Sequence, residues 1–350
     1  MVLSVPGPSR QYKINIQAVA DSILTLQQSN GEIPWSIGDK TDPWDHVEAA
    51  MGLAIGGHYA AARKAYQWLL ENQLSDGSWY SSYQDGKPLD KTRDTNMTTY
   101  IAVGLYQYYL ITKDLTFLEK TWPVVEKAIE FALNLQSPSG KIQWAISPEG
   151  IIDPMALLTG SSSVFMSLKC ALEISHIVGK SRPHWRMAAF NLSHAIIEKP
   201  NLFNISKSRF SMDWFYPILS GAVTGIRAEK RIQRYWSKFV VRDFGVRCVS
   251  DEPWVTLAET AELILALTAM GKTGLARILF SWICDKQFDD GSFFCGFTFP
   301  EVTVWPEEKI SWTNAVILMA ADALYGITPA SDLFSHQFWI QKGITNHYAP

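Results

Sequence analysis

The sequence lacks the features that identify several common classes of protein. Its four cysteines and seven histidines show no CxxC or HxxxH spacing, which argues against a zinc site and against a disulfide framework. A strong charge of one sign is also missing, because the formal net charge is only −3 and offers no attraction to nucleic acid. We therefore expect no metal, no cofactor and no nucleic-acid partner. Unpaired cysteines favour a cytoplasmic location.

Long hydrophobic runs are absent as well. Residues 1–13 contain no apolar core of a signal peptide, and the most apolar late run, residues 315–326, is interrupted by Asp322. We predict neither a signal peptide nor a membrane span. Segments of alternating polarity are also missing, which excludes a β or α/β domain and leaves an all-α protein.

What the sequence does contain is an internal repeat. Residues 48–78 align without a gap on residues 262–292, with identities that include Glu48/Glu262 and a closing Asp-Gly-Ser. A shorter loop, residues 24–35, recurs at residues 133–144. Self-similarity at fixed spacing is typical of an architecture in which one helical unit cannot bury its apolar face alone.

Helical periodicity predicts six hairpins, whose first helices begin near residues 42, 94, 153, 213, 252 and 308. The N-terminal helix, residues 11–29, is the expected return partner of the sixth. Twelve helices in this order predict a single (α/α)6 toroid, an inner barrel of helices wrapped by an outer one. The hairpins span about 11–326, a C-terminal tail spans 327–350, and we expect one domain for the whole of 1–350.

Hairpins that repeat with the same sense have parallel inner helices, so we expect all six inner N-termini to meet at one mouth. Every one of these starts bears a carboxylate, and most bear a Trp. Acids are favoured at helix starts because they accept free N–H groups and complement the dipole. Asp42, Asp153 and Asp251 closely precede a proline, so we predict that they cap helices.

Two acid pairs differ from these caps. Asp45/Glu48 and Glu259/Glu262 stand at equivalent repeat positions, and the members of each pair are three residues apart on one helix face. Buried acids are costly unless they are used. Two interpretations stay open: chemistry in a pocket, or salt bridges to arginines of the outer helices such as Arg63 and Arg277.

The chain has 14 Trp residues, and several fall at helix starts or loop ends, where lining a cleft is as natural as packing in a core. His46 is the one histidine expected at the mouth. The residues predicted to contact a substrate are Trp44, His46, Glu48, Trp79, Asn96, Trp214, Trp254, Glu262, Trp305 and Trp312.

These residues resemble a known superfamily, the α/α toroids shared by six-hairpin glycosidases, terpenoid cyclases and protein prenyltransferases. Residues 64–79, KAYQWLLENQLSDGSW, resemble the QW motif of squalene-type cyclases, and residues 287–294 resemble a prenyltransferase loop. Residues 94–136 are similar to glucoamylase-like six-hairpin enzymes. The acidic DxDD segment of the cyclases does not occur, and the zinc ligands of the prenyltransferases are not matched.

A mouth rich in acids and Trp favours the glycosidase branch, because sugars offer hydroxyls to carboxylates and flat C–H faces to indole rings. We predict hydrolysis of a carbohydrate or glycoconjugate by paired carboxylates. The leading pair is Asp45 and Glu259, with Asp94, Asp213 and Glu307 in reserve. Two alternatives stay open: a terpenoid cyclase or prenyltransferase-like protein acting on an isoprenoid, and a toroid that binds a sugar or lipid without catalysis.

Overall fold

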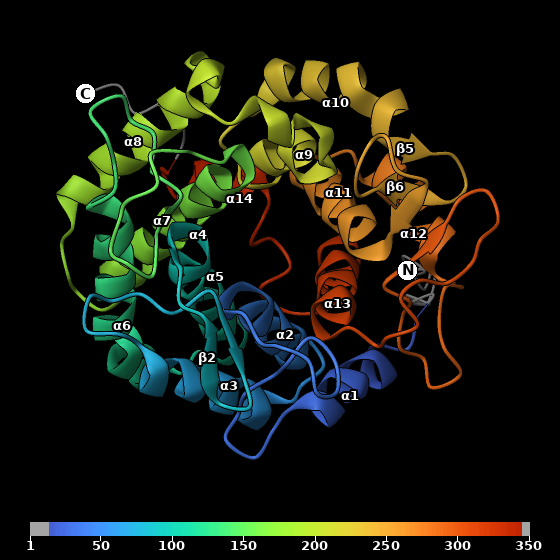
Figure 1. Cartoon of the computed structure of the whole chain (residues 1–350), viewed down its shortest axis with the longest axis horizontal. Coiled ribbons are helices and arrows are strands. Elements are labelled where there is room, and N and C mark those ends of the chain that lie inside the picture. The colour runs from blue at the N-terminus through green and yellow to red at the C-terminus, as the bar shows by residue number, and fades with distance from the viewer. Residues whose placement is uncertain (1–13, 345–350) are drawn as a thin grey trace, which may run out of the picture.

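The computed structural model describes residues 14–344, so residues 11–13 of the expected first helix and residues 345–350 of the tail lie outside the described part. The described chain forms two concentric rings of helices (Figure 1). The inner ring consists of α2 (Pro43–Ile55), α4 with α5 (Thr95–Thr99, Ile101–Thr112), α7 (Leu158–Ile177), α9 (Ser211–Leu219), α11 (Leu257–Ala269) and α13 (Ser311–Tyr325). The outer ring consists of α3 (Tyr59–Asn72), α6 (Leu115–Leu133), α8 (Pro183–Glu198), α10 (Gly225–Phe239), α12 (Thr273–Ile283) and α1 (Ile16–Leu26).

The inner ring closes between the two ends of the chain. Helix α13 packs against both α11 and α2, and the other inner helices follow one another around the axis. Helix α1 packs against α13 and α2, which makes it the outer partner of the sixth hairpin. The predicted (α/α)6 toroid is therefore confirmed.

The two rings differ in their apolar pattern. In α11 every residue from Leu257 to Leu267 is buried, whereas α10 buries only Ala228, Ile232 and Phe239. An inner helix has neighbours on all sides, so it is apolar all round, while an outer helix turns one face to solvent.

Four loops that follow outer helices are built alike. In each, a glutamine side chain donates to the backbone oxygen of a glycine four residues later: Gln27, Gln73, Gln136 and Gln287. Three of these side chains also donate to a carbonyl of the next outer helix: Gln27 to Ala61, Gln73 to Val124 and Gln136 to Ala188. The repeated loop is thus a joint between successive outer helices.

Glycine is required in these joints. Gly77 has a positive φ of 93°, and a Cβ there would lie 2.3 Å from the backbone oxygen of Lys127 in α6. Gly140 has a φ of 95°, and its Cβ would lie 2.4 Å from the backbone oxygen of Asn191 in α8. Only a residue without a Cβ lets the loop approach the neighbouring helix so closely.

Two of the three predicted caps are wrong. Asp42 does cap α2, because its carboxylate accepts from the backbone N–H of Asp45. Helix α7 begins only at 158, and Asp153 accepts from Met155 N–H in the loop before it. Helix α11 begins at 257, and Asp251 forms a surface ion pair with Arg209. An Asp-Pro sequence also suits a turn, and here local turn hydrogen bonds determine its conformation.

Short strands occupy the loops that lead into inner helices, and the sequence analysis missed them. All pairs are antiparallel. They form β1 (Ser82–Gln84) with β2 (Lys87–Asp90), β3 (Arg93–Asp94) with β4 (Ala145–Ile146), and a sheet of β5 (Val240–Val241), β6 (Gly245–Arg247), β7 (Trp254–Thr256) and β8 (Gly296–Thr298). Strands of two to four residues are too short to show alternating polarity.

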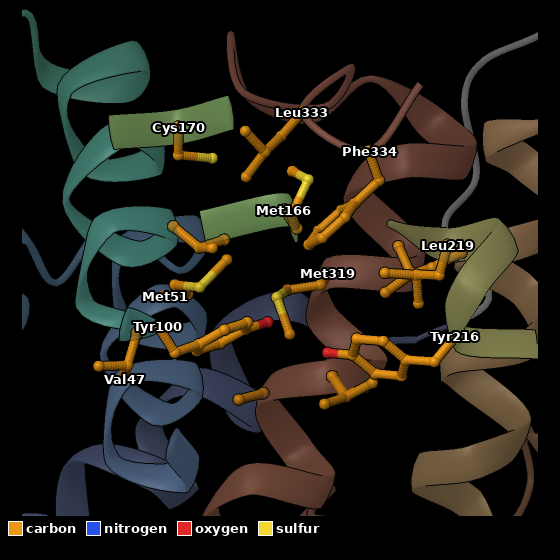
Figure 2. Close-up of a cluster of buried hydrophobic side chains, with 14 of the residues drawn as sticks. Val47, Met51, Tyr100, Met166, Cys170, Tyr216, Leu219, Met319, Leu333 and Phe334 are labelled. Atoms are coloured by element: carbon orange, nitrogen blue, oxygen red, sulfur yellow. The ribbon is translucent and has the colours of Figure 1, made fainter. Parts of the chain in front are cut away.

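The end of the barrel opposite the mouth is closed by the segment that follows α13. Figure 2 shows Leu333 and Phe334 of this segment directed at Met166 and Met319 on the barrel axis. Helix α14 (His336–Gln341) contributes Trp339, which is 3% exposed. The part of the expected tail that is described is therefore a core element. None of the described helices has the length and hydrophobicity that crossing a bilayer demands.

The joints yield a stability prediction. Replacing Gly77 by Ala adds both a strained φ and a clash with Lys127, whereas at Gly86, with a φ of 71°, an added Cβ would have no atom within 4 Å. We expect Gly77→Ala to lower the free energy of unfolding by about 1–3 kcal/mol more than Gly86→Ala, the usual range for overpacking. Urea unfolding of both variants measures this difference. Equal losses would mean that the close approach to α6 does not matter.

Candidate active site

The start of α2 positions two acids at the mouth. Asp42 accepts the backbone N–H of Asp45 (2.9 Å) with one carboxylate oxygen and the indole N–H of Trp35 (2.7 Å) with the other. Pro43 occupies the first helical position, where its fixed φ suits a helix and its missing N–H is not needed. This start places Asp45 in the first turn and Glu48 one turn further along the same face.

Helix α11 repeats this arrangement. Strand β7 runs directly into it, which places Glu259 in the first turn and Glu262 one turn later. The two side chains are buried, with exposed fractions of 7% and 5%. We refer to Asp45, Glu48, Glu259 and Glu262 as the acidic cluster.

The members of the acidic cluster act on one another across the barrel. Burial raises the pKa of Asp45 well above its usual range, and negative neighbours that include Glu48 and Glu262 raise it further. Burial also raises the pKa of Glu262, with Glu48 and Glu259 as the next causes. Since acids on α2 and α11 affect each other in this way, they belong to one site.

Glu48 is held at the centre of this site. Its Oε1 accepts the indole N–H of Trp44 (2.8 Å) and the hydroxyl of Tyr100 (3.2 Å). Both hydrogen bonds lower the pKa of Glu48, but burial is the larger effect and raises it to about 8. The Glu48 side chain is therefore mostly protonated at neutral pH.

Two tyrosines that the sequence analysis missed lie beside the acidic cluster. Figure 2 shows Tyr100 and Tyr216 approaching from opposite sides of the barrel, with their hydroxyl groups toward one another. Trp44 packs against both rings, at centroid distances of 5.5 and 5.7 Å. In the sequence, these tyrosines stand among apolar helix residues and resemble core positions, so no local signal distinguishes them.

The Glu259 side chain forms a hydrogen bond with the thiol of Cys248. The Oε2 of Glu259 is buried and has no hydrogen-bond partner among residues 14–344. Two thiols lie near Glu259. Burial is the main cause that raises the pKa of Cys295 to about 12 and the pKa of Cys248 well above its usual range, and Glu259 is the second cause for both. An unpartnered buried carboxylate oxygen is costly unless a ligand or water binds to it.

The salt-bridge interpretation of the acid pairs is wrong. Arg63 pairs with Asp114 (2.7 Å), and Arg277 donates to the backbone oxygen of Leu324 (3.4 Å). None of the ion pairs within the described chain involves the acidic cluster. Within the described chain, these acids are thus not neutralised by ion pairs with cations.

A cavity of about 250 Å³ adjoins the acidic cluster and is lined by three predicted site residues, Trp44, Asp94 and Asn96. Asp94 caps α4, because its Oδ1 accepts the backbone N–H groups of Asn96 (2.7 Å) and Met97 (3.0 Å). Burial raises its pKa to about 6. Asp94 is therefore a cap at the edge of the cavity, outside the acidic cluster.

Asp213, the second reserve catalytic residue, also holds a helix start. Its Oδ1 accepts the backbone N–H (3.1 Å) and the hydroxyl (2.7 Å) of Thr159, in the first turn of α7. Burial raises the pKa of Asp213, and these hydrogen bonds oppose the rise. Asp213 thus joins α9 to α7, and it is not a member of the acidic cluster.

His46 does not face the mouth, so its prediction as a substrate contact is wrong. It is fully buried, its Nδ1 accepts the backbone N–H of Ile33 (3.1 Å), and its Nε2 donates to the backbone oxygen of Ala65 (2.9 Å). Burial lowers its pKa to about 4. His46 is a neutral bridge that joins α2 to α3 and to the loop before α2.

Trp79 is also internal, contrary to the prediction that it contacts substrate. Trp214 is buried but lines a second cavity of about 140 Å³ with Asp213, so its role as a substrate contact stays a prediction. Trp79 is 1% exposed and donates to the backbone oxygen of Leu69 (2.9 Å). Trp214 is 2% exposed and donates to the backbone oxygen of Arg231 (2.9 Å). Each indole N–H links one element to its neighbour. A Trp at a loop end can have this structural role instead of lining a cleft.

Of the other predicted residues, Trp254 begins β7, Trp305 and Glu307 lie on the loop before α13, and Trp312 lies in the first turn of α13. The Trp254 indole donates to the backbone oxygen of Trp305 (2.9 Å), and Trp305 is 59% exposed. Trp312 packs edge-on against Trp35 at 6.0 Å. Glu307 is exposed on the loop before α13. A role for these residues in binding or catalysis stays a prediction.

Acids, histidines and cysteines do not combine into a metal site in the described part of the chain. No group of three or more such side chains within residues 14–344 is placed to hold a metal ion. The raised pKa values of Asp45, Glu48 and Glu262 mean that these groups can donate a proton as well as accept one.

Comparison with known proteins adds one close relative. The chain is 43% identical over 335 residues, 95% of its length and 92% of the other, to the MMP endo-(1,4)-3-O-methyl-alpha-D-mannosidase of Mycolicibacterium hassiacum. No protein-family model matches the chain. An identity of this size over almost the whole of both chains implies a shared fold and a shared family.

Solved structures agree on the fold. A mannosylglycerate hydrolase of glycoside hydrolase family GH63 from Thermus thermophilus superposes with a TM-score of 0.69 at 11% identity, over 87% of this chain and 99% of that one. A D-mannose isomerase superposes with a TM-score of 0.67 at 11% identity, over 90% of this chain and 98% of that one. Because a hydrolase and an isomerase share this architecture, the likeness bears on fold alone.

The raised pKa of Glu48 predicts how stability depends on pH. A folded-state pKa of about 8 against 4.5 for an ordinary glutamate means that the folded protein holds an extra proton between these values. The contribution of Glu48 to stability therefore falls as pH rises from about 5 to 8. We expect Glu48→Gln, which keeps an acceptor for Trp44 and Tyr100, to raise the melting temperature more at pH 8 than at pH 5.

Thermal unfolding at both pH values measures this effect, with the exposed Glu71→Gln as the control. A Glu48→Gln shift of the same size at both pH values would contradict a buried, protonated Glu48.

Proposed function

The chain belongs to the family of glycoside hydrolase-like enzymes that includes the mannosidase of M. hassiacum, and we propose that it cleaves internal α-(1,4) bonds in chains of 3-O-methylmannose. The acidic cluster at the mouth of the toroid is the single observation that carries this proposal. Hydrolysis of a glycosidic bond needs one carboxylic acid to protonate the leaving oxygen and one carboxylate to activate water or attack the sugar.

Asp45 suits the role of the acid. Burial and the surrounding acids raise its pKa well above the usual range, so that it retains a proton to donate near neutral pH. It stands in the first turn of α2 at the mouth. We assign the protonation of the leaving oxygen to Asp45.

Glu259 suits the role of the second carboxylate. Its Oε2 is buried without a hydrogen-bond partner among the described residues, and is therefore free to accept from an attacking water or to approach the sugar. Glu48 and Glu262 have raised pKa values, so each can donate as well as accept a hydrogen bond to sugar hydroxyls. Whether Glu259 acts as base or as nucleophile decides the stereochemistry of the product.

The isoprenoid-enzyme alternative and the alternative of a toroid that binds ligand without catalysis have no comparable support from the residues at the mouth. A cavity that guides an isoprenoid carbocation needs an aromatic wall with few acids, whereas four acids gather here. A toroid that only binds ligand would have no need to keep several carboxyl groups protonated and free of cations, which is costly for folding. The cytoplasmic location and the single-domain organisation expected from the sequence remain predictions.

The proposal predicts the effect of removing either member of the pair. We expect Asp45→Asn and Glu259→Gln each to lower kcat on an α-(1,4)-linked 3-O-methylmannose oligosaccharide by at least about a hundredfold, the usual scale for a general acid or base. The melting temperature should hold or rise, because each variant removes a buried acid. Product chromatography and thermal unfolding supply the two measurements.

Glu119→Gln is the matched control, because Glu119 is exposed on α6 in the outer ring, away from the mouth. It should leave kcat within about twofold of the wild-type value. If Asp45→Asn or Glu259→Gln keeps full activity and loses several degrees in melting temperature, that residue has a structural role and the proposed pair is wrong.

A further inference from the structure

The cavity beside the acidic cluster has a lining that suits a particular kind of sugar. Its volume is about 250 Å³, enough for one pyranose ring. The apolar lining residues are Trp44, Met97, Ile142, Trp144 and Leu157, and the polar ones are Asp94, Thr95, Asn96, Thr159 and Ser161, with Gly160 between them. Sugar sites combine such apolar walls with a small number of placed polar groups.

One residue, Trp44, connects the cavity with the proposed catalytic centre. Trp44 lines the cavity, and its indole N–H donates to Glu48 of the acidic cluster (2.8 Å). A ligand in the cavity would thus contact Trp44, the residue that holds Glu48 of the acidic cluster. In a chain substrate, the sugar in this position would be joined to the one being cleaved.

Most polar groups of the lining are engaged within the protein. Asp94 accepts two backbone N–H groups at the start of α4. The hydroxyl of Thr95 donates to the backbone oxygen of Trp144 (2.9 Å), and the hydroxyl of Thr159 donates to Asp213 (2.7 Å). These groups have little capacity left for the hydroxyls of a sugar.

Two lining residues, Ser161 and Asn96, are exceptions. Apart from the backbone hydrogen bonds of its helix, such as that of its N–H to Leu157, Ser161 has none within residues 14–344. Asn96 has an unpartnered amide oxygen. Asn96 is only 5% exposed, and its Oδ1 has no hydrogen-bond partner within the described chain. A buried amide without a partner is costly, and rotation of the amide can present either its oxygen or its nitrogen to a ligand. Asn96 and Ser161 therefore offer polar contacts in a cavity whose remaining wall is largely apolar.

On this basis, and resting on the proposed function, we propose that the cavity is the subsite for the O-methylated mannose next to the cleaved bond and selects a methyl ether over a free hydroxyl. A methyl ether adds apolar surface against Met97, Ile142 and Leu157, and it has no O–H to leave unpaired. A free hydroxyl at the same place would lose its water without gaining a partner. Discrimination of this kind is worth about tenfold to a few hundredfold in kcat/KM.

Gly160 provides a way to fill the cavity without disturbing the backbone. It lies in the first turn of α7, and a Cβ there would meet Asn96 Cβ at 3.5 Å and Leu157 Cβ at 3.7 Å, which are ordinary contact distances. Alanine therefore fits at this position. A leucine at 160 extends further and occupies the space that the sugar would take.

The test compares Gly160→Leu with its control Gly160→Ala on two α-(1,4)-mannose oligosaccharides of equal length, one 3-O-methylated and one unmethylated. We expect the wild type and Gly160→Ala to prefer the methylated substrate by at least about tenfold in kcat/KM. Gly160→Leu should lose most of this preference, mainly through a higher KM. An unchanged preference in Gly160→Leu would overturn the proposal.

A second variant guards against misfolding of Gly160→Leu. Leu157→Ser places a hydroxyl in the apolar wall at the N-cap of α7, where serine favours the helix. It should reduce the preference for the methylated substrate and leave the melting temperature unchanged or higher. If Leu157→Ser keeps the full preference, the wall does not select the methyl group.

Binding separates this proposal from the proposed function. Calorimetry with methyl 3-O-methyl-α-D-mannoside needs no turnover, and we expect Gly160→Leu to weaken binding at least about tenfold while Gly160→Ala does not. If the wild type binds this ligand but cleaves neither oligosaccharide, the hydrolase function fails and the subsite stands. If the wild type cleaves both substrates equally and does not bind the ligand, the subsite fails and the hydrolase function stands.

Discussion

The glutamine joint between successive outer helices is the contact on which the ring depends. Gln73 donates to Gly77 within its own loop and to Val124 on the next outer helix, and the same pattern recurs after α1 and α6. Three such joints link α1 to α3, α3 to α6 and α6 to α8, one after another around the ring (Figure 1). At the last loop, Gly291 lies against Ala18 of α1, and the chain meets its own beginning.

A closed ring explains how the protein tolerates its acids. The acidic cluster lies on α2 and α11, which both pack against α13, so acids far apart in the sequence are forced into one neighbourhood. Burying several carboxyl groups without cations opposes folding, and the outer joints and the apolar inner helices offset that cost. As a result, the carboxyl groups of Asp45, Glu48 and Glu262 have raised pKa values, which exposed carboxyl groups in water would not have.

In our proposals, Trp44 takes part in both the catalytic centre and the subsite that selects the substrate. Its side chain lines the cavity, and its indole N–H donates to Glu48 of the acidic cluster. In Figure 2, Tyr100 and Tyr216 lie below Met166, and Leu333 and Phe334 of the closing C-terminal segment lie above it. Because that segment blocks the far end, substrate has to approach from the mouth, where the loops before the inner helices lie.

Sequence alone determined the repeat, the hairpin order, the cap at Asp42 and the pairing of Asp45/Glu48 with Glu259/Glu262, because all of these follow from local spacing along a helix. Tertiary structure alone decided which polar groups face the mouth. His46 is adjacent to Asp45 in sequence yet bonds inward to Ala65, since neighbouring residues of a helix point in different directions. The partners of a side chain belong to other hairpins, and only closure of the ring brings them into contact.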